Sequence, residues 1–179
     1  MGGCATPSLR KCETMTMSEA LIGELMQEAA TTRRVLERVP EDRLSWAPHW
    51  KSMTLGQLAL HIATVPGGVA EFLTTSPQEV PVFDRPQAAS RAEILTALEE
   101  SIANAREKLS SWSDDDLLSE WKMVRGQDTI MALPRIGMVR AIMLNHWYHH
   151  RGELLVYLRL LDVPVPSVYG PSADENPFA

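Results

Sequence analysis

Hydrophobic side chains recur at intervals of three and four residues in four separate stretches of the chain. The first stretch runs from Thr16 to Val39 and is followed by Pro40. Thr16 and Glu19 have the spacing of a capping box, in which each side chain bonds the backbone N–H of the other residue. The stretch therefore predicts an amphipathic α-helix that ends at the proline.

The second stretch begins at Thr54, which forms a second candidate capping box with Gln57, and continues to about Thr75. Pro66 lies inside it and has no backbone N–H. In a helix that N–H would bond the carbonyl four residues earlier, which belongs to Ile62. We therefore expect a second helix in which the Ile62 carbonyl lacks its usual partner.

Two further helices are predicted in the second half of the chain. Ser90 is the expected N-cap of a helix that reaches Leu109, and a last long helix is expected from Pro134 to Leu161. Between them, Ser113 and the three aspartates after it resemble the cap of a short extra turn. Residues 121–124 and 129–133 then form either a small hairpin or an irregular insert before the last helix.

These segments predict an all-α fold, a four-helix bundle, because no set of parallel strands accompanies them. The segment 76–89 is long enough to be a crossover connection between helices that run in the same direction. We expect a disordered N-terminal extension over residues 1–15, one domain over residues 16–179, and a C-terminal tail over residues 163–179 that folds back across the bundle.

Composition narrows the classes of function. The 179 residues are 45% hydrophobic, which is enough for one sizeable core, and the net charge is −6 with the Lys and Arg residues scattered. This balance argues against a nucleic-acid partner. Cys4 and Cys12 precede the first predicted helix, and the chain has neither a long apolar run nor a signal-peptide pattern. We expect a cytoplasmic protein without a membrane partner.

His146 and His150 are the most informative residues of the last predicted helix. They are four residues apart and so share one helix face. The same face carries an apolar series: Val139, Ile142, Met143, Leu154, Tyr157, Leu158 and Leu161. Burying an unpaired imidazole costs roughly 1 to 3 kcal/mol, so each ring must find a hydrogen-bond partner or a metal ion.

His61, on the second predicted helix, is a candidate third member of this group. In helical bundles, metal ligands come from side chains on facing helices. Three neutral imidazoles hold a divalent ion and leave positions open for water or substrate, which is typical of catalytic sites. The alternative from the residues alone is a hydrogen-bonded histidine network without metal.

Three segments resemble the DinB/YfiT-like family, which is unrelated to the DNA polymerase of similar name. They are residues 58–63 around His61, residues 146–153, and residues 169–175. The resemblance implies a four-helix bundle that binds a divalent metal, most often nickel or zinc, and forms a homodimer. It also implies that His61, His146 and His150 are the metal ligands and that His149 is not one.

Glu153 stands where the family often has glutamine. It lies about 20° from His146 around a helix, so it faces the same side. It is a candidate second-shell acceptor, fourth ligand or general base, and otherwise a solvent-exposed residue at the mouth of the bundle. Arg151 points away from this face, which favours a structural salt bridge or a dimer contact. His49 is expected at the surface or in packing.

Three functions are candidates, and the resemblance suggests the first of them. The first is a metal-dependent thiol S-transferase, since members of the family use small thiols such as bacillithiol or mycothiol to act on small electrophiles. The second is a metal-dependent hydrolase in which an activated water replaces the thiol and Glu153 is the base. The third is a non-catalytic metal-binding or stress-response bundle.

Overall fold

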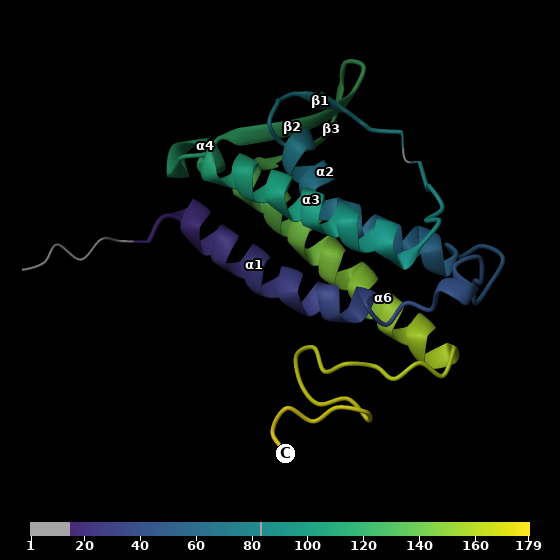
Figure 1. Cartoon of the computed structure of the whole chain (residues 1–179). Helices are drawn as coiled ribbons and strands as arrows, with labels where there is room; N and C mark the ends of the chain where they lie inside the picture. The colour runs from purple at the N-terminus through teal and green to yellow at the C-terminus, as the bar shows by residue number, and fades with distance from the viewer. Residues whose placement is uncertain (1–14, 83) are drawn as a thin grey trace, which may run out of the picture.

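Four long helices lie side by side in the computed structural model, which describes residues 15–82 and 84–179 (Figure 1). The extension predicted at residues 1–15 therefore lies, apart from Met15, outside the described residues, and so do both cysteines. The long helices are α1 (Met17–Leu36), α2 (Leu55–Phe72), α3 (Arg91–Ser110) and α6 (His146–Leu160). The predicted all-α bundle is confirmed.

Polar contacts between the helices establish their directions. Near its start α1 contacts the end of α3, where the Ser18 hydroxyl donates to the carbonyl of Leu109, so these helices are antiparallel. α2 and α3 run in the same direction. The Gly67 N–H donates to the Ser101 hydroxyl, and further along both helices Glu71 pairs with Lys108. The chain between α2 and α3 is therefore the predicted crossover connection.

Local capping determines where the helices begin. Thr16 forms the predicted capping box of α1, and Thr54 forms that of α2. The short helix α4 (Asp114–Leu118) has a third box, formed by Ser113 and Asp116, as the sequence predicted. A single 3₁₀ turn, η1 (Glu41–Arg43), lies in the linker after α1. The predicted end of α2 was three residues too late, because the helix ends at Phe72.

A small sheet packs at one end of the bundle (Figure 1). The hairpin predicted before the last helix is present as β2 (Glu120–Arg125) and β3 (Asp128–Pro134), which are antiparallel. Gly126, at the first position of the tight turn, has a φ of +59°, which glycine adopts without steric cost. The sequence did not predict β1 (Gln78–Glu79), which pairs in parallel with β2, because two residues show no alternation.

The last predicted helix consists of three consecutive segments. They are α5 (Arg135–Met138), the π-helical η2 (Val139–Asn145) and α6, so the prediction of one uninterrupted α-helix was wrong. A π-helix is wider than an α-helix and shifts the faces that its residues present. The change back to α-helix occurs at His146.

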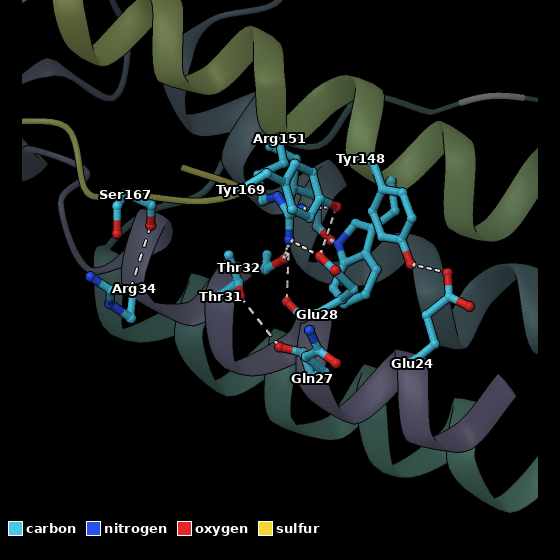
Figure 2. Close-up of polar contacts among 12 residues, drawn as sticks. Glu24, Gln27, Glu28, Thr31, Thr32, Arg34, Tyr148, Arg151, Ser167 and Tyr169 are labelled. Atoms are coloured by element: carbon cyan, nitrogen blue, oxygen red, sulfur yellow. Dashed lines mark hydrogen bonds and ion pairs between the residues drawn. The ribbon is translucent and has the colours of Figure 1, made fainter. Parts of the chain in front are cut away.

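The side of α6 that faces α1 carries a buried polar network (Figure 2). Arg151 is 1% exposed and pairs with Glu28, which is 7% exposed, at an N–O distance of 2.6 Å. The Arg151 guanidinium also donates to the hydroxyls of Thr32 and Tyr169. Of the two roles expected for Arg151, the structure therefore shows the structural salt bridge.

The C-terminal tail folds back onto the bundle through the same network. The Tyr169 hydroxyl donates to Glu28 at 3.0 Å while it accepts from Arg151. Further along the tail, Glu175 pairs with Arg34 of α1. The tail thus holds α1 and α6 together on the side opposite to α2.

Within the described ranges, none of the helices combines the length and the apolar character that crossing a membrane requires.

Candidate metal centre

A hydrogen bond between α2 and α6 lies directly beside the candidate site. The indole N–H of Trp147 donates to the carbonyl of Ile62 at 2.9 Å. This is the carbonyl that Pro66 deprives of its helical partner, and both Ile62 and Trp147 are fully buried. Ile62 directly follows His61 in the chain, and Trp147 directly follows His146. The bond between them therefore also sets the position of His61 relative to His146.

The structure brings His61, His146 and His150 together. Their ring centroids are 5.2 Å apart for His61 and His146, 4.6 Å for His61 and His150, and 4.4 Å for His146 and His150. One nitrogen of each ring lies within 4.8 Å of those of the other two. All three side chains are partly buried, so they face a site that solvent can reach.

These positions suit a divalent ion. Two imidazole nitrogens that are each about 2.05 Å from an ion lie roughly 2.9 to 3.3 Å apart for bond angles between about 90° and 109°. The Nε2 atoms of His61 and His146 are 3.0 Å apart. The same separation also suits an N–H···N hydrogen bond, so binding of a metal by these residues stays a prediction.

Glu153 contacts His150. The Nδ1 atom of His150 lies 2.6 Å from Oε2 of Glu153. A proton on Nδ1 satisfies this contact and leaves a free lone pair on Nε2, which is the arrangement that second-shell carboxylates impose on metal-binding histidines. Glu153 also lies 3.4 Å from His149, whose side chain is 64% exposed. Of the roles considered for Glu153, the geometry favours that of an acceptor that orients the ring of His150.

Burial favours the neutral form of two of the site imidazoles, His61 and His146. Burial, and to a smaller extent the neighbouring His150 and His146, lower the pKa of His61 to about 4. Burial, and then the neighbouring His150 and His149, also lower the pKa of His146. Neutral imidazoles are the form that binds metal ions, so both rings are prepared for ligation at neutral pH.

A cavity of about 390 Å³ opens directly onto the histidines. His61 and His146 form one of its ends, and α2 supplies most of its wall. The remaining wall comes from Ile142 of η2, Met123 of β2 and Pro81. The small sheet therefore completes the cavity beside the candidate metal ligands.

Sequence reasoning found the histidines but missed this cavity. The apolar spacing of α2 predicted that Val65, Val69 and Phe72 face the core. Val65 is buried there and the other two are partly buried against it, but all three also line the cavity. The contribution of Met123 and Pro81 had no local signal, because it depends on where the hairpin and the crossover pack. His49 is exposed, as expected.

Comparison with known proteins agrees with this fold. The model of the DinB family matches residues 15–177. The chain belongs to the DinB family. This confirms the family resemblance seen in the three segments 58–63, 146–153 and 169–175.

Individual relatives within the DinB family are distant in sequence. The chain is 26% identical to the protein YrdA of Bacillus subtilis (strain 168) over 150 residues, which cover 83% of this chain and 85% of YrdA. It is similar to a crystal structure of a DinB-like protein from Bacillus cereus ATCC 10987, with 25% identity, a TM-score of 0.69, and coverage of 87% of this chain and 99% of the other. A DinB-like protein from Bacillus subtilis, YjoA, shares the fold at 17% identity, with a TM-score of 0.60 and coverage of 87% and 98%.

Proposed function

We propose that this protein is a metal-dependent thiol S-transferase that acts on small electrophiles, with nickel or zinc as its cofactor. The observation that carries the proposal is the opening of the 390 Å³ cavity onto two of the three clustered histidines. A closed structural site would be surrounded by protein, whereas this cluster has space beside it for a second molecule.

His61, His146 and His150 would hold the ion. When bound, a divalent ion lowers the pKa of a coordinated thiol and so supplies a nucleophile near neutral pH. In the transfer, the thiol loses its proton to solvent, its sulfur forms a bond to carbon, and the leaving group departs with the electrons of the broken bond. Glu153 fixes the orientation of the His150 ring through the 2.6 Å contact.

A thiol panel tests this proposal. Metal-loaded and metal-stripped protein are each mixed with monochlorobimane and one of several thiols, namely cysteine, glutathione, bacillithiol or mycothiol, and the fluorescent conjugate is followed over time. We expect at least one thiol to react on the order of 100-fold faster with the loaded protein, a typical scale for positioned nucleophilic groups. His150→Ala abolishes this gain, and His149→Ala, which alters an exposed neighbouring ring, retains it.

Equal rates with loaded and stripped protein for every thiol would refute the transferase proposal. Loss of the gain in His149→Ala as well as in His150→Ala would show that the effect is not specific to the three-histidine cluster.

A hydrolase is the second candidate, and the position of Glu153 favours it. Its carboxylate is 42% exposed at the edge of the cluster, where it can both contact His150 and accept a proton from water. If the reaction is hydrolysis, Glu153→Gln lowers the rate of ester cleavage and leaves the metal content intact. An unchanged turnover in this variant would remove Glu153 from the mechanism.

A further inference from the structure

The wall of the cavity beside the histidines is apolar and follows one face of α2. His61, Val65, Gly68 and Phe72 succeed one another at intervals of three and four residues along this face. Opposite them lie the side chains of Ile142 and Met123. The volume of about 390 Å³ falls within the range of pockets that bind small organic molecules.

The wall offers no full charge with which to pair an ionic ligand. Among the described residues that line it, none has a carboxylate, ammonium or guanidinium group. The hydroxyl of Thr64 donates to the carbonyl of Leu60 within its own helix. An ionic group placed here would lose water without gaining a partner, whereas an uncharged apolar group would gain contacts.

A second cavity, between α1 and α3, has the opposite character. It has a similar volume of about 400 Å³, but Arg33, Glu99 and Arg106 are among its lining residues. Its lining residues belong to α1 and α3, whereas the candidate ligands belong to α2 and α6. Lack of charge is therefore a property of the cavity at the histidines and not of every hollow on this protein.

Gly68 keeps the cavity open. It lies in the middle of the α2 wall, and a Cβ atom added there would meet no atom within 4 Å. The adjacent Gly67 is different, because a Cβ there would lie 2.7 Å from the Ser101 carbonyl oxygen. Gly67 thus serves the packing of α2 against α3, while a side chain at position 68 would extend into the cavity.

We propose that this cavity binds an uncharged apolar group, such as one that carries an aromatic ring, and holds it against the His61 and His146 end of the site. The inference rests on the proposed function in one respect: the bound group would be the apolar part of the electrophile. The cavity selects electrophiles by that group, and it excludes those that carry a charge in the same place.

Binding of a simple aromatic probe tests this inference independently of turnover. Fluorobenzene and 4-fluorobenzoate are titrated into metal-stripped full-length protein, so that the carboxylate has no ion to bind, and followed by ¹⁹F NMR. The variants are Gly68→Leu, which fills the cavity, Gly68→Ala, which fills a smaller part of it, and Gly23→Leu. The last is a matched control, because Gly23 lies on exposed α1 surface and its added Cβ also meets nothing within 4 Å.

We expect saturable binding of fluorobenzene to the native protein and to Gly23→Leu. Binding should be at least tenfold weaker in Gly68→Leu and intermediate in Gly68→Ala, and 4-fluorobenzoate should bind the native protein at least tenfold more weakly than fluorobenzene. Zinc content and thermal midpoint are measured in every variant. If Gly68→Leu does not fold, the graded effect of Gly68→Ala decides.

Undiminished fluorobenzene binding in the Gly68 variants, or equal binding of the charged probe, would overturn the inference. Failure of the proposed function is distinguishable from this result. If the protein binds fluorobenzene as expected but has no thiol-transfer activity, the result supports the apolar cavity and refutes the transferase. If the protein is active but does not bind fluorobenzene, the result supports the transferase and refutes the inference about the cavity.

Discussion

Replacing Trp147 with phenylalanine tests whether its indole compensates for the proline in α2. The substitution removes the indole N–H that donates to the buried Ile62 carbonyl at 2.9 Å. Leaving a buried carbonyl unpaired costs about 1 to 3 kcal/mol. The smaller ring adds a cavity cost that does not depend on the hydrogen bond. The single variant therefore mixes two effects.

A double-mutant cycle with Pro66→Ala separates them. Alanine at position 66 restores the backbone N–H that bonds the Ile62 carbonyl in an ordinary helix. In this background Trp147→Phe still creates the cavity but no longer leaves the carbonyl unpaired. We expect Trp147→Phe to cost about 1 to 2 kcal/mol less in the Pro66→Ala protein than in the native protein.

The assay is urea unfolding of metal-free protein, followed by far-ultraviolet circular dichroism for all four members of the cycle. For a chain of this length, each kcal/mol also corresponds to a change of roughly 2 to 4 °C in the thermal midpoint. An equal cost of Trp147→Phe in both backgrounds would refute the reasoning, since it would mean that the carbonyl gains nothing from the indole.

Two other predictions concern the contacts of α6 with α1 and with the C-terminal tail. Arg151→Met leaves Glu28 charged and buried, and it should lower the free energy of unfolding by about 3 to 5 kcal/mol. Arg33→Met, which breaks an exposed ion pair, should change this free energy little. Similar losses in the two variants would contradict the buried network. The Arg159 guanidinium holds the pKa of Asp174 below its usual value. The stabilisation from this carboxylate is therefore complete above about pH 4, and it is lost as the pH falls through the lowered pKa. In urea unfolding, the difference between the native protein and Asp174→Asn should be constant from pH 7 to pH 5 and shrink toward pH 3, and a difference that grows on acidification would contradict this sign.

Local chemistry explains the part of the fold that the sequence predicted. The capping boxes at Thr16 and Thr54 involve residues three apart, so the spacing alone located the starts of α1 and α2. The shared face of His146 and His150 followed from helical geometry in the same way. The missing helical partner of the Ile62 carbonyl was also predictable, because it depends only on the position of Pro66.

The parts that were missed depend on contacts between distant residues. Nothing local to Pro66 indicates that the donor to Ile62 is the indole of Trp147, which is 85 residues away. β1 forms only because the crossover packs beside β2, and the cavity exists because Met123 is brought opposite α2. The contact between Glu153 and His150 was partly predictable, since spacing put both residues on the same side of the helix but left several roles open for Glu153.

Metal content is the most direct test of the central claim, that His61, His146 and His150 form one divalent metal site. Untagged native protein and the alanine variants of these three histidines are dialysed against zinc or nickel and then against metal-free buffer, and bound metal is measured by plasma mass spectrometry. His49→Ala and His149→Ala serve as controls, because both side chains are exposed. We predict about one ion per chain in the native protein and in both controls, and almost none in the three cluster variants. Equal metal content in all six proteins would contradict the claim.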